Sequence, residues 1–85
     1  MKAKLLKTDG DVKEIQPQNG ADFALDELQQ HVGGYIEIVR ISKDMIMVVN
    51  EEGLLEQLEP NLFASAIVGY MIVGNVVVCD SKMVK

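Results

Sequence analysis

The sequence predicts an α+β domain: an antiparallel sheet of about four to five strands with one amphipathic helix across a face and a second short helix. Three observations support this class. Short runs of β-prone residues come in pairs joined by polar turns, apolar residues recur at helical spacing between the pairs, and 48% of the 85 residues are hydrophobic. A chain of this length and composition forms a single domain, residues 1–85, with a hydrophobic core.

The first hairpin is predicted from residues 3–8 and 12–16, which flank the polar turn Asp9-Gly10-Asp11. This turn resembles the opening of a calcium loop. The twelfth position of such a loop needs a glutamate, and Gly20 stands there instead. The segment is therefore interpreted as a hairpin turn and not as a metal site.

The first helix is predicted at residues 23–32, followed by Gly33-Gly34, which ends it. Asp22 is expected to act near the helix N-terminus as a cap or as a partner of the helix dipole. The apolar face of this helix consists of four residues at near-helical spacing: Phe23, Leu25, Leu28 and Val32.

A second hairpin is predicted from residues 35–41 and 45–50, which are apolar and β-branched and are separated by Ser42-Lys43-Asp44. Side chains alternate between the two faces of a strand. Neither face of residues 35–41 is cleanly polar, so we expect a central strand, covered by the helix on one side and by another element or a partner chain on the other.

The second helix is predicted at residues 61–68, because Pro60 suits a helix start, Asn61 suits the capping position and Gly69 suits the end. Its buried side is expected to consist of Leu62, Phe63, Ala66 and Ile67.

The last strand is predicted from residues 70–73 and 76–80, which bracket Gly74-Asn75. This pair forms either a tight turn or a bulge in one continuous strand, and we favour the bulge because a tight turn would leave very short strands. Residues 81–85 are expected to form a frayed polar tail. The apolar stretch 61–79 approaches the length of a membrane span, but its glycines, its polar residues and its valine run argue against a spanning helix.

Composition excludes several functions. Eight basic residues stand against thirteen acidic ones, so direct binding of nucleic acid through phosphate neutralisation is not expected. The single cysteine, Cys79, has no partner for an internal disulfide, and the N-terminus has no apolar run long enough for a signal peptide. These features predict a cytoplasmic protein without membrane attachment.

No catalytic residue, metal site or cofactor is predicted. Cys79 follows a run of valines, where it is interpreted as a small buried hydrophobic residue. His31 is the only histidine, and one histidine and one cysteine far apart in sequence do not make a metal ligand set. The protein is therefore not expected to be an enzyme.

Three ordered motifs resemble the bacterial and phage family DUF3846, a domain of unknown function: LQQHVGGYIEIV at 28–39, IMVVNEEGLL at 46–55 and PNLFASAIVGYMIVGNVVV at 60–78. The chain departs from the family pattern at Ala24, where a capping serine or threonine is usual, and at Asn75, where an acidic residue is common. The resemblance implies an accessory protein of phages, plasmids or conjugative elements, with no established catalytic activity.

We therefore expect a small intracellular accessory protein of a phage or mobile element that binds a protein partner stoichiometrically and forms a homodimer. Asn61 and Ser65 lie one turn apart on one helix face, so they either support the helix locally or contact a ligand. The candidate binding residues are Glu51, Glu52, Glu56, Asn61 and Ser65.

Two alternative functions stay open. The first is an acidic inhibitor that mimics DNA, in which carboxylates imitate phosphates: Glu51, Glu52, Glu56 and Glu59. The second is a protein that sequesters a small ligand or nucleotide at a subunit interface. An anionic ligand would require basic residues to converge, namely Lys2, Lys4, Lys7, Lys13 and Arg40.

Overall fold

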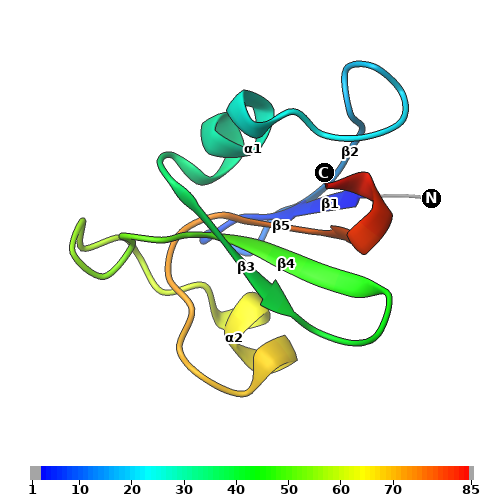
Figure 1. Cartoon of the computed structure of the whole chain (residues 1–85). Helices are drawn as coiled ribbons and strands as arrows, with labels where there is room; N and C mark the ends of the chain where they lie inside the picture. The colour runs from blue at the N-terminus through cyan, green and yellow to red at the C-terminus, as the bar shows by residue number, and fades with distance from the viewer. Residues whose placement is uncertain (1–2, 85) are drawn as a thin grey trace.

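A computed structural model describes residues 3–84, which form a five-stranded antiparallel sheet with a helix on each face (Figure 1). The predicted α+β class is confirmed. The strand order across the sheet is β2-β1-β5-β4-β3. The elements in chain order are β1 (Ala3–Leu6), β2 (Val12–Ile15), α1 (Leu25–Val32), β3 (Ile36–Arg40), β4 (Met45–Asn50), α2 (Leu62–Val68), β5 (Val76–Asp80) and the 3-10 helix η1 (Ser81–Met83).

Two of the inner strands, β4 and β5, bury both of their faces, because successive side chains point to opposite sides of the sheet. On one side, Ile46, Val48, Val77 and Cys79 pack with α1 residues Leu28 and Val32. On the other side, Met47, Val49 and Val76 pack with Ala64 of α2 and with Ile72. The domain therefore has three layers, with the sheet between α1 and α2.

The start of α1 differs from the prediction. Phe23 is buried but lies before the helix, where it forms an isolated parallel bridge with Val84. Leu25, predicted to be buried, is exposed. The N-cap residue is Ala24 and not Asp22, and the Glu27 carboxylate accepts a hydrogen bond from the Ala24 N–H at 2.9 Å. This bond pairs the backbone N–H of the N-cap residue, as the glutamate of a capping box does.

The predicted buried face of α2 is wrong. Leu62 and Phe63 are 75% and 52% exposed, and Ala66 and Ile67 are exposed as well. The helix turns Ala64 towards the sheet instead, with no exposed surface. The reason lies at the cap, where the side chain of Asn61 is fixed to the chain beneath it.

Asn61 is buried, and its amide holds three segments together. Its Nδ2 donates to the Leu6 carbonyl at 3.0 Å and to the Gly74 carbonyl at 2.9 Å. Its Oδ1 accepts from the Ala64 N–H at 3.0 Å, which caps α2. These bonds fix the rotation of the helix, so Ala64 faces inward one turn later and the larger apolar residues face outward.

β3 lies at the edge of the sheet, which corrects the prediction of a central strand. It pairs with β4 alone among the described strands. The central position belongs to β5, which inserts between β1 and β4 and leaves the β3–β4 hairpin on the outside. The apolar residues of β3 are therefore half-buried or exposed, and Ile38 keeps 43% of its surface in solvent.

Residues 70–75 do not continue β5, so the predicted bulged strand is wrong. Val73 makes only an isolated bridge with Pro60. Gly74 has a φ of 82°, in the left-handed region, and its N–H donates to the Glu59 carbonyl at 2.7 Å. The chain therefore changes direction at Gly74 and enters the sheet only at Val76.

The C-terminal segment is ordered up to Val84, in contrast to the predicted frayed tail. The Asp80 carboxylate caps η1 by accepting from the Lys82 N–H at 2.8 Å. Met83 is buried against the α1 side of the sheet. Lys85, also assigned to the tail, lies outside the described residues.

Replacing Asn61 should show that its amide donors matter more than its capping oxygen. Asn61→Ala leaves the Leu6 and Gly74 carbonyls without their donor, and we expect a loss of roughly 2 to 4 kcal/mol in the free energy of unfolding. Asn61→Asp keeps a good cap but removes the same donors, so its loss should be at least as large. Urea denaturation measures both. A near-wild-type stability for Asn61→Asp would mean that the residue acts only as a cap.

Candidate functional site

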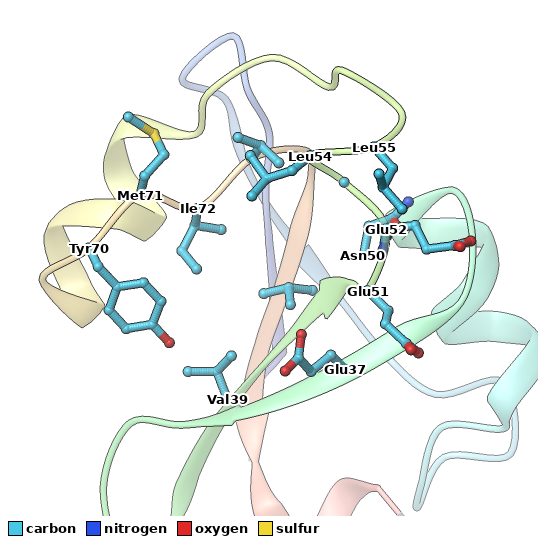
Figure 2. A pocket seen from close by; sticks show the side chains of 13 residues that line it. Glu37, Val39, Asn50, Glu51, Glu52, Leu54, Leu55, Tyr70, Met71 and Ile72 are labelled. Atoms are coloured by element: carbon cyan, nitrogen blue, oxygen red, sulfur yellow. Dashed lines mark hydrogen bonds between the residues drawn. The ribbon is translucent and has the colours of Figure 1, made fainter.

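A groove of about 460 Å³ opens on the α2 side of the sheet. Three segments form it, as Figure 2 shows: β3 supplies one border, the loop after β4 supplies one end, and the segment after α2 supplies the opposite wall. The lining residues are Glu37, Val39, Val49, Asn50, Glu51, Glu52, Gly53, Leu54, Leu55, Tyr70, Met71, Ile72 and Val73.

The groove is mainly apolar. Val49 and Ile72 are buried at its base. Leu54 and Leu55 are 76% and 81% exposed, and Tyr70 extends its ring from the opposite wall towards Val39 (Figure 2). Exposed leucines and an aromatic side chain beside a hollow present surface that is stabilised when a partner covers it.

Three carboxylates border this apolar surface: those of Glu37, Glu51 and Glu52. Within residues 3–84, no hydrogen bond or ion pair engages their side-chain oxygens, and no lysine or arginine lines the groove. The groove is therefore bordered by negative charge that no described residue neutralises. A basic group of a partner would meet a favourable potential there.

The five predicted binding residues have different positions. Glu51 and Glu52 line the groove. Glu56 lies beside it, where its Oε1 accepts from Asn50 Nδ2 at 3.0 Å, and it lines a smaller adjoining hollow with Glu52 and Tyr35. The acidic loop thus contributes two of its glutamates to the groove and uses a third to hold its own conformation.

Asn61 and Ser65 do not line the groove but support its wall. The Ser65 hydroxyl donates to the Asn61 carbonyl at 2.7 Å and accepts from the Ile72 N–H at 2.8 Å. The Asn61 N–H donates to the Ile72 carbonyl at 2.8 Å. Both residues therefore fix Ile72 in place, and we assign them to the support of the groove and not to its surface.

Sequence reasoning missed five exposed residues of the groove: Glu37, Leu54, Leu55, Tyr70 and Met71. Two signals pointed to some of them. Leu54 and Leu55 are adjacent leucines in an otherwise acidic loop, and Tyr70 and Met71 directly follow Gly69, which ends α2 in the left-handed conformation. Glu37 gave no such signal, because only the edge position of β3 brings it to the groove.

Cys79 and His31 lie on the α1 side of the sheet. Cys79 is fully buried, and burial raises the pKa of its thiol from 9.0 to about 11, with the neighbouring Asp80 carboxylate adding to the rise. A reactive cysteine needs a lowered pKa and access to solvent. The His31 ring packs edge-on against Phe23, with 6.4 Å between the ring centroids.

The basic residues do not converge on one site. Lys4 lies on β1 and Arg40 on β3, and β5 and β4 stand between these two strands. The Arg40 guanidinium donates to the Ser42 and Lys43 carbonyls of its own hairpin turn, at 3.4 and 3.0 Å. Lys2, also considered for an anionic ligand, lies outside the described residues.

Residues 3–84 contain no group of three or more His, Cys, Asp or Glu side chains placed to hold a metal ion. None of the helices formed by these residues is long and apolar enough to cross a membrane.

The fold and the groove define a small three-layer α+β domain with a carboxylate-bordered apolar groove along one edge of its sheet. The chain belongs to the DUF3846 family: the family model, described as a domain of unknown function, matches residues 1–83. The resemblance seen in the three sequence motifs is thereby confirmed. No curated protein and no solved structure matches the chain.

The raised pKa of Cys79 should appear in the pH dependence of stability. Above about pH 9 the thiol ionises in the unfolded chain, whereas the folded thiol stays protonated until about pH 11. The folded state then binds more protons, so its stability falls as the pH rises through this window. We expect the urea midpoint to fall more between about pH 8 and about pH 10 in the wild type than in Cys79→Ala, which has no thiol. Equal decreases in the two proteins would contradict the assignment.

Proposed function

We propose that this protein is a small intracellular accessory protein of a phage or mobile genetic element, and that it acts by binding a protein partner stoichiometrically and not by catalysis. The observation that carries the proposal is the groove, in which exposed Leu54 and Leu55 lie beside the unneutralised carboxylates of Glu51 and Glu52. Such a combination of apolar area and charge suits the recognition of another protein. The family resemblance supports the phage or mobile-element origin.

The position of Cys79 supports an intracellular location. The free thiol is buried in the sheet and forms no disulfide, and its raised pKa protects it from oxidation. A small domain without a disulfide suits the reducing cytoplasm. We therefore place the protein and its partner in that compartment.

The DNA-mimic and ligand-sequestering alternatives have less support. A surface that imitates phosphates needs charge without apolar contacts, whereas the carboxylates here alternate with Leu54, Leu55 and Tyr70. An anionic ligand would find no cation among the described residues that line the groove. Protein binding uses both the apolar and the acidic character of this surface.

Groove substitutions should reduce capture of the partner. Leu55→Ser removes an exposed apolar side chain that a partner would bury, and we expect roughly tenfold or greater weakening of binding. Leu25→Ser is the matched control, because Leu25 is also an exposed leucine but lies on α1, across the sheet. Affinity capture from a host undergoing infection or conjugation identifies the partner, and titration of the purified pair measures the affinities.

The same titration compares two matched charge reversals and tests for catalysis with a substitution of His31. Glu52→Lys should weaken binding more than Asp26→Lys, which makes the same charge change on α1. His31→Gln should leave partner binding unchanged. Equal effects of Leu55→Ser and Leu25→Ser would remove the groove from the proposal, and loss of function in a stably folded His31→Gln would argue for catalysis.

Self-association is a separate proposal, and α2 supplies a surface for it. Leu62, Phe63 and Ile67 expose apolar area on this helix, and burial contributes about 25 cal/mol per Å². We expect light scattering at about 100 μM to give roughly twice the monomer mass of 9.4 kDa, because two-fold dimers are the commonest assemblies. Phe63→Ser should return the protein to a monomer. A wild-type mass near 9.4 kDa would reject the dimer.

A further inference from the structure

The edge of β3 carries unpaired backbone groups. The Glu51 N–H donates to the Tyr35 carbonyl, and the Ile41 N–H donates to the Met45 carbonyl. In an antiparallel pair, the residues that exchange bonds with the neighbouring strand alternate with residues whose N–H and C=O point away. Tyr35 and Ile41 belong to the paired set, so the backbone groups of Ile36, Ile38 and Arg40 point out from the sheet.

This edge carries the charged residues Glu37 and Arg40 but has no proline and no bulge. Natural edge strands are blunted by proline, bulges, charged side chains or a covering segment. β3 pairs with β4 in continuous register from Ile36 to Arg40, without a bulge. Ile38 at its centre is partly exposed, and the Arg40 guanidinium is held over its own hairpin turn. The opposite edge, β2, has only four residues and carries Lys13 and Glu14 at its centre.

The groove lies along the same strand. Glu37 and Val39 of β3 form its border, and both side chains project to the α2 side because they share one face of the strand. A strand added to the edge would place two of its own side chains directly opposite these residues, on that face. The unpaired backbone and the groove would thus contact one added segment together.

We propose that β3 binds an extended segment of a protein partner as a sixth strand of the sheet, with side chains at every second position facing the groove. The two border residues determine which side chains this segment should carry. A lysine or arginine would lie opposite Glu37, and an apolar side chain would lie opposite Val39, where Tyr70 could also contact it. Glu37 and Val39 are two residues apart, so the basic and apolar residues of the partner are also two apart. This inference rests on the proposed function and names the kind of segment that the groove takes.

A second copy of this chain suits the site less well. Two copies could pair their β3 edges about a two-fold axis. The longest symmetric overlap of residues 36–40 places Ile38 of one copy opposite Ile38 of the other. It places the two Glu37 side chains on one face as diagonal neighbours, about 7 to 8 Å apart. The groove would then gain another carboxylate in place of a cation. A partner segment with a lysine or arginine opposite Glu37 would replace this repulsion with an attraction.

The first experiment selects ligands from random peptides of about twelve residues displayed on phage, long enough for one strand. We expect the enriched sequences to carry Lys or Arg two positions from an apolar residue, in either chain direction. The same selection on Glu37→Gln should lose the basic preference, whereas Asp26→Asn on α1 should retain it. No enrichment, or enrichment without basic residues, would overturn the proposal.

The second experiment tests the backbone contact through Ile38→Pro. The Ile38 N–H points away from β4, so proline removes an outward donor without removing a bond within the sheet. We expect fluorescence polarisation to show that Ile38→Pro weakens the binding of a selected peptide roughly tenfold or more. Ile38→Val should bind the peptide like the wild type. Wild-type affinity in a folded Ile38→Pro protein would refute strand addition. Light scattering accompanies this test: a dimer that is lost only in Ile38→Pro would identify a second copy as the occupant and overturn the proposal.

Binding of N-methylated peptides to the wild-type protein tests the same backbone contact. This test stays decisive if Ile38→Pro does not fold. N-methylation should abolish binding at alternate positions and leave it intact between them, because only every second peptide N–H would point to β3. Uniform loss or no loss along the peptide would count against strand addition. If partner capture depends on Leu55 but not on this backbone contact, the proposed function stands and the sixth strand is wrong.

Discussion

The buried amide of Asn61 is the interaction on which the rest of the α2 side depends. It connects the end of β1, the turn at Gly74 and the first turn of α2. These segments are distant in sequence, since Leu6 and Asn61 are separated by 55 positions. A buried donor must be paired, because an unpaired polar group in the interior is strongly unfavourable. One side chain thereby determines both how the helix is rotated and where the chain enters the last strand.

The groove follows from that rotation. Ala64 brings α2 close to the sheet, and Asn61 and Ser65 together hold Ile72 in the wall. The segment after the helix consequently runs beside the β3–β4 hairpin without covering it. Gly53 permits the loop after β4 to close the end, because a Cβ at this position would lie 2.7 Å from Cγ2 of Val73. The surface that we propose to bind protein is therefore built on contacts beneath it.

The sequence was sufficient for the local elements and insufficient for their arrangement. Both hairpins and the two helices follow from turn residues, β-branched runs and helix ends, which are short-range signals. The position of β5 between β1 and β4 depends on long-range pairing, which no local pattern encodes, so β3 was expected at the centre. Glu51 and Glu52, which line the groove, were singled out from charge alone, and their role in binding stays a prediction, whereas the position of Glu37 at the groove required the sheet order. The face of α2 was assigned wrongly because hydrophobic spacing favoured Leu62 and Phe63, while hydrogen bonding at Asn61 determined the rotation.

The central place of β5 also governs the order in which this domain can assemble. β1 is made well before β5, yet the two strands are direct neighbours, as the pairing of Leu5 with Val77 shows. Contacts of such sequence separation slow folding, because a long loop must close before they form. On the ribosome, the two hairpins would emerge with the edges of β1 and β4 still open, and only the final strand joins them. The nascent chain is thus exposed to incorrect strand pairing until β5 has emerged.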